Sequence, residues 1–316
     1  MKNIVENVKV LNQHEGQNYI IYNGDCVEVL KGIPSNSIHL SVSSIPFNSL
    51  YTYSASDRDM GNNRNNTQFF EQYLFLAREW FRVTMPGRNV CIHCMNLPTS
   101  KERDGYIGIS DFRGDIIRLM QSVGFIYHSE VCVWKNPVTA MQRTKALGLL
   151  HKQLKKDSCM SRMGIPDYVV TFRKPGDNPE RVEHTNESYP VSKWQNVASP
   201  IWDIYASPVW WDIDMGKTLN RLAAKEEKDE RHIAPLQLEV IERCVELWSN
   251  PGDIVLDPFD GIGSTGYQAL LMGRKHVGVE LKESYYKLAC ENLDKADAGD
   301  TEQMKFGMDA GAEDAG

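Results

Sequence analysis

The segment Leu256-Asp257-Pro258-Phe259-Asp260-Gly261-Ile262-Gly263-Ser264-Thr265 lies between an apolar run at 254–256 and a helical pattern at 265–272. A strand, a glycine-rich turn and a helix in this order bind a nucleoside-bearing cofactor at the carboxyl ends of parallel strands in α/β folds. Glycines allow the backbone to approach a ligand closely. This segment therefore predicts a cofactor site in a parallel α/β sheet.

An acid at the end of the next strand supports the same prediction. Glu280 follows the expected strand 276–279 and comes 23 residues after Asp257, close to the spacing of about 20 at which an acid accepts hydrogen bonds from ribose hydroxyls. No Lys-Ser or Lys-Thr pair follows the glycines, so a phosphate-binding P-loop is disfavoured. Asp257 adds negative charge before the first glycine, which suits a cationic ligand. S-adenosylmethionine carries cationic sulfonium and ammonium groups. Asp257 therefore favours S-adenosylmethionine over NAD as the cofactor.

The composition limits the class of protein. The chain has 316 residues, of which 41% are hydrophobic and 24% charged, so we expect about two domains or one large α/β domain with an insertion. No apolar run approaches the roughly 18 to 20 residues that span a bilayer, so no membrane segment is expected. Seven widely spaced cysteines imply no disulfide framework and favour the reducing cytoplasm.

Strand and helix patterns alternate along the chain, which predicts an α/β fold with a mostly parallel sheet. Besides the strands that flank the glycine-rich turn, the expected strands are residues 19–22, 38–43, 89–93, 124–134 and 166–172. Besides the helix after that turn, the expected helices are 67–83 with Thr67 as N-cap, 115–122, 235–248 and 283–293.

Charge is distributed unevenly in this acidic chain, whose net charge is −7. Residues 135–181 contain ten basic and four acidic side chains, a local excess of positive charge that fits contact with nucleic acid. An ordinary solvated surface is the alternative interpretation. From residue 294 onward, seven acids and two lysines indicate a solvated end.

A second short motif, Ser44-Ile45-Pro46-Phe47, follows the expected strand 38–43. Pro46 fixes its φ and stiffens the turn. The Ser44 hydroxyl and the Ile45 carbonyl could accept hydrogen bonds from an exocyclic amine, and Phe47 could stack on a planar base for about 1–3 kcal/mol. A strand-end turn with a buried Phe is the alternative interpretation of this motif alone.

With both motifs in view, the chain resembles the β-class of DNA amino-methyltransferases, which methylate N6 of adenine or N4 of cytosine. Residues 44–47 resemble their catalytic tetrapeptide Asp/Asn/Ser-Pro-Pro-Tyr/Phe, and the glycine-rich segment is similar to their cofactor loop. Residues 23–30 and 232–237 also resemble family segments, and the tetrapeptide precedes the cofactor loop as it does in the β-class.

The resemblance implies a Rossmann-like methyltransferase fold with helices on both faces of the sheet. It implies that residues 1–137 form the catalytic half, 138–230 an inserted target-recognition region, 231–295 the cofactor-binding half and 296–316 a disordered acidic tail.

The resemblance also assigns site residues, with S-adenosylmethionine as cofactor and no metal. The catalytic residues would be Ser44, Ile45, Pro46 and Phe47. The cofactor-binding residues would be Asp25, Cys26, Pro235, Gln237, Asp257, Pro258, Phe259, Gly261, Gly263, Ser264, Thr265 and Glu280. The candidate DNA-binding residues are Arg143, Lys145, Lys152, Lys155, Lys156 and Arg162.

The implied function is methyl transfer to the exocyclic amine of a base flipped out of double-stranded DNA. Ser44 at the head of the tetrapeptide favours N4 of cytosine, with N6 of adenine as the alternative. Ile45 stands where the family has its first proline and residues 234–236 also depart from the family pattern, so an inactive DNA-binding decoy is a further alternative. Methylation of RNA or of a protein amide stays open, and the partners that the resemblance suggests are a homodimer and a cognate restriction endonuclease.

Other chemistry-bearing residues favour structural roles. Cys91-Ile92-His93-Cys94 lies on an expected strand and lacks a second cysteine pair at zinc-finger spacing. The sequence shows no Ser/His/Asp arrangement, and His39 and His93 are expected to be packed. Trp194, Trp202, Trp210 and Trp211 are interpreted as core or interface residues more readily than as base-stacking ones.

Overall fold

The structure is a computed structural model that describes residues 10–47, 66–138, 151–185, 205–219 and 235–299. Within these residues a nine-stranded sheet has the order β1-β2-β11-β10-β3-β4-β8-β7-β9, and a separate ladder pairs β5 with β6. The strands are β1 (Asn12–Glu15), β2 (Tyr19–Asn23), β3 (Ile38–Ser44), β4 (Thr84–Met95), β5 (Leu97–Pro98), β6 (Ile109–Ser110), β7 (Ile126–Val133), β8 (Asp167–Arg173), β9 (Val209–Trp210), β10 (Ile254–Asp257) and β11 (Lys275–Glu280).

The central sheet is mostly parallel, as predicted. Strands β2, β11, β10, β3 and β4 pair in parallel, whereas β1 is antiparallel to β2 and β8 is antiparallel to both of its neighbours, β4 and β7. Because parallel strands end at the same edge, the residues that follow β2, β3, β10 and β11 lie along one carboxyl edge.

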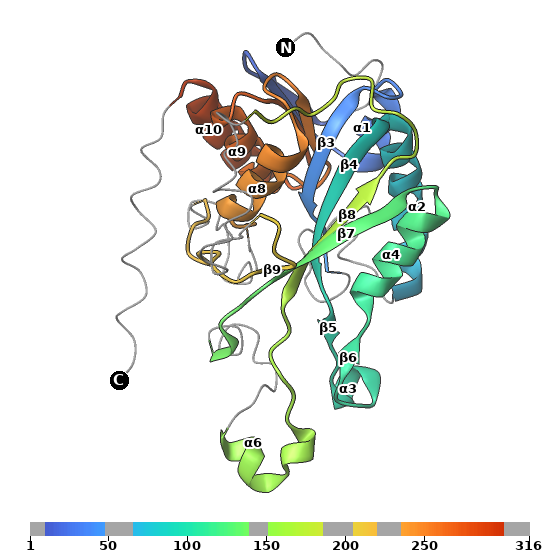
Figure 1. Ribbon diagram of the computed structural model, residues 1–316, viewed down its shortest axis with the longest axis vertical. Coiled ribbons are helices and arrows are strands. Elements are labelled where there is room, and N and C mark those ends of the chain that lie inside the picture. Colours follow the sequence, from blue (N-terminus) through green and yellow to red (C-terminus); the bar gives the residue numbers. More distant parts are fainter. Residues whose placement is uncertain (1–9, 48–65, 139–150, 186–204, 220–234, 300–316) are drawn as a thin grey trace.

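Helices cover both faces of this sheet, which confirms the α/β prediction (Figure 1). The helices are α1 (Cys26–Gly32), α2 (Asn66–Val83), α3 (Lys101–Asp104), α4 (Phe112–Ser122), α6 (His151–Lys156), α8 (Leu238–Trp248), α9 (Ser264–Leu271) and α10 (Glu283–Asp297). Helices α1, α2 and α4 contribute to one buried hydrophobic cluster, and α8, α9 and α10 contribute to the other. Helix α2 begins at Asn66, so Thr67 lies inside the helix and is not its N-cap.

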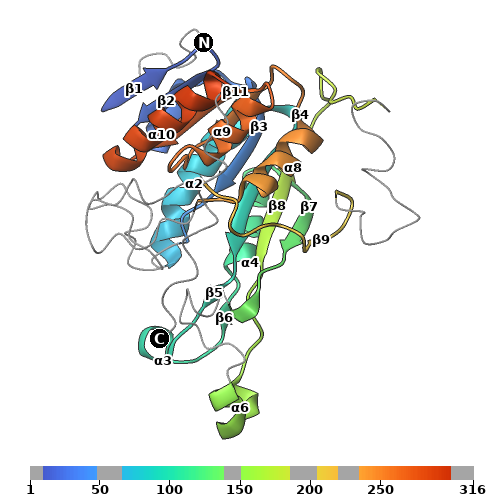
Figure 2. The same cartoon turned by 90° about the vertical axis from the view of Figure 1, so that its left-hand side faces the viewer.

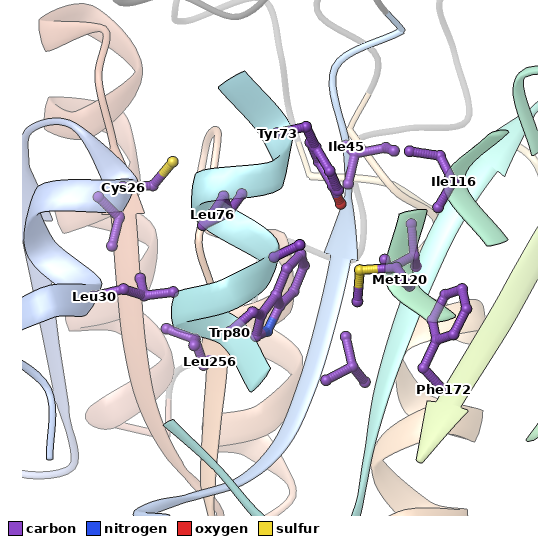
Figure 3. Packing of buried hydrophobic residues seen from close by; sticks show 14 of the residues in the cluster. Cys26, Leu30, Ile45, Tyr73, Leu76, Trp80, Ile116, Met120, Phe172 and Leu256 are labelled. Carbon is purple, nitrogen blue, oxygen red and sulfur yellow. The ribbon is translucent and has the colours of Figure 1, made fainter. Parts of the chain in front are cut away.

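The cluster under α1, α2 and α4 is drawn in Figure 3. Trp80 of α2 is fully buried in it, and its indole N–H donates to Ser41 Oγ of β3 at 2.8 Å, so the one polar atom of this ring is satisfied. Ile45, directly after β3, points into the same cluster beside Tyr73 and opposite Ile116 (Figure 3). The core therefore reaches the tetrapeptide itself.

The expected boundaries of the inserted region need correction. Strand β8 falls within 138–230, yet it pairs with β4 along seven residue pairs and also with β7. Its alternate side chains, such as Val170 and Phe172, are fully buried in the core. Region 138–230 therefore supplies a central strand of the catalytic sheet and is not a separate insertion throughout.

The acidic end of the chain begins later than the charge pattern suggests. Helix α10 continues to Asp297, whose Oδ2 accepts from the Gln17 amide at 2.6 Å, and Asp294 Oδ1 accepts from the Tyr19 hydroxyl at 2.6 Å. These two acids fasten α10 to the turn between β1 and β2. The polar strand β1 has no alternating pattern to predict it.

Figures 1 and 2 show that α6 extends away from the sheet, at the end where β4 leads into β5. A 3₁₀ turn at Ser158–Met160 follows α6 and leads back toward β8. Among the described residues, no helix is long and apolar enough to cross a membrane.

Candidate active site

The two sequence motifs meet at the carboxyl edge of the sheet. Strands β3 and β10 are parallel neighbours, and the Ser43 hydroxyl donates to Asp257 Oδ1 at 2.6 Å. Both side chains are buried. The Thr265 hydroxyl, in the first turn of α9, donates to the Val42 carbonyl of β3 at 3.2 Å. Strand β3, which leads into the tetrapeptide, is thus joined directly to the cofactor loop and the start of α9, although more than 200 residues separate these segments in the sequence.

The cofactor loop between β10 and α9 is shaped by hydrogen bonds to its own backbone. Asp257 Oδ1 accepts from the Phe259 amide at 3.0 Å, and the Gly263 amide donates to the Asp260 carbonyl at 2.8 Å. Pro258 is buried beside Asp257. The chain then turns through left-handed conformations at Gly261 (φ 56°) and Gly263 (φ 85°), which favour glycine.

These two glycines face different surroundings. A Cβ added at Gly261 would meet no atom within 4 Å, whereas one at Gly263 would lie 3.4 Å from Ala289 of α10. Gly263 is therefore the close approach between loop and helix, and it precedes Ser264 and Thr265, both buried. Gly261 borders open space, as a residue beside a bound ligand would.

Glu280 and Asp25 lie at the ends of the neighbouring strands. Glu280 Oε2 accepts from the Gly261 amide at 2.9 Å, and its Oε1 accepts from the Lys282 amide at 2.7 Å. Asp25 follows β2 and is the N-cap of α1, where it accepts from the Val27 and Glu28 amides. Cys26, the first residue of α1, is buried, and burial raises the pKa of its thiol. Asp25 and Glu280 therefore both hold backbone around the expected cofactor position.

A buried acidic pair lies under the cofactor loop. Burial, and then the charge of Asp260, raise the pKa of Asp257 to about 7, although the hydrogen bond from Ser43 lowers it. Asp260 Oδ1 lies 3.1 Å from His276 Nε2, and both side chains are fully buried. His276 Nδ1 donates to the Val255 carbonyl at 3.1 Å. A cation placed beside Asp257 would favour its ionised form.

Gln237 provides a test of whether a polar ligand fits this edge. It lies at the N-cap of α8, is 8% exposed, and makes no side-chain capping hydrogen bond. Its Oε1 has no hydrogen-bond partner within the part of the chain that the structure describes. Since a buried amide oxygen is ordinarily paired, this atom fits a ligand with a donor group. Pro235 lies two residues before it and is half-buried.

The tetrapeptide is held by the core. Ile45 is 1% exposed and packs beside Tyr73, so the residue in place of the family's proline anchors the loop through burial instead of ring rigidity. Burying an isoleucine side chain stabilises by about 1.5–3 kcal/mol. Phe47 is half-buried, and its ring contacts His93 edge-on with centroids 6.1 Å apart.

A chain of side chains extends from Ser44 into the sheet. Ser44 Oγ lies 2.9 Å from His93 Nδ1, His93 Nε2 lies 3.0 Å from Asp167 Oδ2, and Lys135 Nζ pairs with the same oxygen. We call Ser44, His93, Asp167 and Lys135 the side-chain array. His93 is packed as expected, but it belongs to a Ser/His/Asp arrangement that the sequence pattern did not show.

The array was missed because its members are far apart in the sequence. Ser44 and His93 are register partners on β3 and β4, and Asp167 begins β8, which pairs with β4. The signal in the sequence was that Ser44 directly follows the predicted strand 38–43 and that His93 ends the predicted strand 89–93. Predicting the array required the strand order β3-β4-β8.

The candidate DNA-binding residues have mixed outcomes. Lys155 and Lys156 are exposed on α6. Arg143 and Lys145, and the side chain of Lys152, lie outside the described residues. Arg162 is half-buried and its guanidinium donates to the Gly108 carbonyl, so the structure gives it a local role instead.

Of the four tryptophans interpreted from the sequence, the structure describes Trp210 and Trp211, and of these two only Trp210 is a core residue. Trp210 is 1% exposed within the second core cluster, whereas Trp211 is 49% exposed. Trp194 and Trp202 lie outside the described residues.

Comparison with known proteins shows the family to which the chain belongs. A model of the DNA methylase family matches residues 38–291. The DNA adenine methyltransferase YhdJ of Escherichia coli strain K12 is 25% identical over 289 residues, which cover 90% of this chain and 85% of that protein. The type II methyltransferase M.Cfr9I of Citrobacter freundii is 25% identical over 297 residues, with 88% of each chain covered.

Solved structures share the fold. The Thermus thermophilus protein TTHA0409, complexed with S-adenosyl-L-methionine, has a TM-score of 0.61 at 24% identity and covers 88% of this chain and 95% of its own. The cytosine-N4-specific PvuII DNA methyltransferase also has a TM-score of 0.61, at 18% identity, with 89% and 91% of the two chains covered.

Proposed function

Because this chain belongs to the DNA methylase family, whose model matches most of it, we propose that it transfers a methyl group from S-adenosylmethionine to the exocyclic amine of a base in double-stranded DNA. N4 of cytosine is the favoured target. The observation on which the proposal rests is the 2.6 Å hydrogen bond from Ser43 to Asp257. This bond supports the proposal because it brings the strand that leads into the tetrapeptide against the first residue of the cofactor loop.

The residues around the cofactor loop suit S-adenosylmethionine. When bound, this cofactor supplies an activated methyl group on a positively charged sulfur. Asp257 would stabilise positive charge, and Gln237 Oε1, which has no partner among the described residues, would accept from the ammonium group. Glu280 would accept from the ribose hydroxyls, because a carboxylate offers about four lone-pair sites. Gly261, with no side chain, leaves room for the ligand.

The tetrapeptide suits the amine. The lone pair of an aromatic amine is delocalised into its ring, which makes the nitrogen a poor nucleophile. Ser44 Oγ and the Ile45 carbonyl would accept its hydrogens and so localise the lone pair, and they would stabilise the positive charge that develops on nitrogen. Phe47 would stack on the flipped base. Holding the nitrogen in line with the methyl group would supply much of the acceleration.

The chemistry at Ser44 serves either amine, so the target base rests on a weaker argument. Serine at the head of the tetrapeptide favours N4 of cytosine. One relative is named as a DNA adenine methyltransferase, which supports N6 of adenine as the second candidate.

The exposed lysines of α6 would contact the DNA backbone. Lys155 and Lys156 lie beyond the sheet on an extension of the fold, where they could neutralise phosphates without entering the catalytic site (Figure 2). We propose that Arg143, Lys145 and Lys152, which belong to the same basic region, add to this contact.

Incubation with unmethylated DNA and methyl-labelled S-adenosylmethionine, followed by mass spectrometry of the nucleosides, tests the proposal. We expect N4-methylcytosine among the nucleosides. N6-methyladenine would establish the second candidate. Labelling of RNA or protein in parallel reactions, without labelling of DNA, would show that the substrate is RNA or protein instead. No incorporation anywhere, with intact cofactor binding, would favour a DNA-binding decoy.

A further inference from the structure

The chemistry of the side chains in the array determines which atom donates and which accepts in each of its hydrogen bonds. Burial raises the pKa of Asp167, but its pairing with His93 and Lys135 and the hydrogen bonds from both outweigh burial and leave the pKa below its usual value. Asp167 is therefore a carboxylate and can only accept hydrogen bonds. His93 Nε2, 3.0 Å from Asp167 Oδ2, must then carry the proton.

The direction of the hydrogen bond between His93 and Asp167 determines the role of Ser44. In a neutral imidazole with its proton on Nε2, Nδ1 is an acceptor. The Ser44 hydroxyl, 2.9 Å from Nδ1, must donate its hydrogen there. Because that hydroxyl has one hydrogen, Ser44 Oγ has only lone pairs to offer a third group. His93 thus makes Ser44 an acceptor, as an incoming amine requires.

We propose that His93 is a positioning residue for Ser44 and takes up the hydroxyl proton of Ser44 during methyl transfer, while Asp167 holds the imidazole in the required tautomer. The inference rests on the proposed function, because it assigns a role within that same site. His93 is suited to both tasks, since it is 7% exposed and also contacts the ring of Phe47.

Methyl transfer leaves one proton in excess on the amine nitrogen. The amine nitrogen forms a bond to the methyl carbon with its lone pair, and the pair of the broken carbon–sulfur bond stays on sulfur. The nitrogen gives up one proton to Ser44 Oγ as the hydroxyl proton of Ser44 moves to His93 Nδ1. His93 becomes an imidazolium paired with Asp167, and its extra proton leaves to solvent after the product dissociates. A carboxylate behind a histidine stabilises such an imidazolium.

Lys135 completes the array. Its ammonium group pairs with the same oxygen of Asp167 that His93 contacts, and it is 21% exposed, whereas Asp167 is 2% exposed. A buried carboxylate needs such compensation to stay ionised. Lys135 thus maintains the charge of Asp167.

Single-turnover methylation of DNA by His93→Ala tests the inference. We expect the rate of methyl transfer to fall about 100-fold, as for loss of a proton acceptor, with cofactor affinity by calorimetry within twofold of wild type. Added imidazole should restore part of the rate. Asp167→Asn should lower the rate about 10-fold or more.

Cys91→Ala is the matched control. Cys91 is buried on the same strand two residues before His93, and it lies outside the array. We expect this variant to transfer methyl groups within twofold of wild type and to show no response to imidazole. A loss in Cys91→Ala equal to that in His93→Ala would overturn the inference, because the effect would then belong to the strand.

A spectroscopic readout is independent of turnover. The ring ¹⁵N resonances of His93, assigned by their loss in His93→Gln, should show a protonated Nε2 and an unprotonated Nδ1, and Ser44→Ala should shift the Nδ1 resonance. A protonated Nδ1 in the free protein would overturn the inference. So would an active wild type with an unaffected His93→Ala, whereas a wild type that methylates nothing would overturn the proposed function itself.

Discussion

The cofactor loop and the side-chain array lie side by side at one edge of the sheet, but they are built in different ways. The loop at 257–263 is shaped by hydrogen bonds in which carboxylates and carbonyls accept from backbone amides between Asp257 and Lys282. The array consists of side chains contributed by β3, β4, β8 and the segment directly after β7. Backbone shape should govern cofactor binding, whereas single side chains should govern methyl transfer. Substitutions can therefore separate the two.

The largest effect is expected on the array side. Ser44→Ala removes an acceptor that the amine needs in the transition state, so methyl transfer should fall about 10³-fold, the upper range for loss of one such hydrogen-bonding group. Single-turnover kinetics with labelled cofactor measures the loss, and calorimetry should find cofactor affinity near that of wild type. Full turnover in this variant would contradict the catalytic assignment of Ser44.

The next effect belongs to the loop. Asp257→Asn keeps an oxygen for the Ser43 and Phe259 hydrogen bonds but removes the negative charge. Hydrogen bonds to charged groups contribute about 1.5–3 kcal/mol, so cofactor affinity should fall about 10- to 100-fold. Calorimetric titration measures the change. Asp115→Asn, on the exposed surface of α4, is the control and should bind as wild type does. Equal affinity in Asp257→Asn and wild type would mean that the loop binds without this charge.

A smaller effect should appear with pH. Since burial raises the pKa of Asp257 to about 7, half of the free protein carries a neutral Asp257 near that pH. If a cationic cofactor needs the carboxylate, its affinity should fall about fivefold from pH 7 to pH 6, and binding should release a proton. Calorimetry in buffers of different ionisation enthalpy measures both quantities. Asp257→Asn should remove this pH dependence, and a wild-type affinity that does not change with pH would contradict the assignment.

The same raised pKa has the opposite sign for stability. Between pH 3.8, the ordinary pKa of the group, and about 7, the folded protein binds a proton at Asp257 that the unfolded chain lacks. The contribution of Asp257 to the free energy of unfolding should therefore decrease as pH rises through this window. The difference between wild type and Asp257→Asn in denaturant titrations at several pH values isolates that contribution.

The smallest effect should distinguish the two glycines of the loop. Gly261→Ala places a methyl group in open space at a left-handed φ, so it should cost about 1 kcal/mol of stability. Gly263→Ala carries the same backbone cost and places its methyl group in van der Waals contact with Ala289 of α10 at 3.4 Å, so its stability should fall by a similar amount. Denaturant unfolding measures both. We expect Gly261→Ala to lower cofactor affinity by more than its loss of stability explains, and we expect no such excess loss for Gly263→Ala. The reverse order would place the ligand elsewhere.

The sequence predicted the loop because the loop is contiguous. A strand, its turn, the following helix and Glu280 fall within one short window, so their spacing carries the geometry. The array could not be predicted in this way, because positions 44, 93, 135 and 167 meet only through the order of strands. The same limit explains why β8 was assigned to an insertion. Its apolar pattern predicted a strand, but no local signal states which neighbours a strand will pair with.

Ile45, which stands in place of the family's proline, shows at a single residue that a sequence pattern does not reveal the residues packed around a side chain. The sequence indicates a loss of rigidity, but burial cannot be judged until α2 and α4 are placed around the side chain (Figure 3). Similarly, Arg162 belongs to a basic stretch by composition, yet its guanidinium donates a hydrogen bond to the Gly108 carbonyl.

Strand β8 has a consequence for exchanging recognition specificity between related proteins. A chimera that swaps residues 138–230 as one block would replace a strand that lies between β4 and β7, and with it Asp167. Grafts should instead leave 167–173 native and change the segments before and after it separately. Residues 138–230 thus combine candidate recognition segments with two strands of the sheet, β8 and β9.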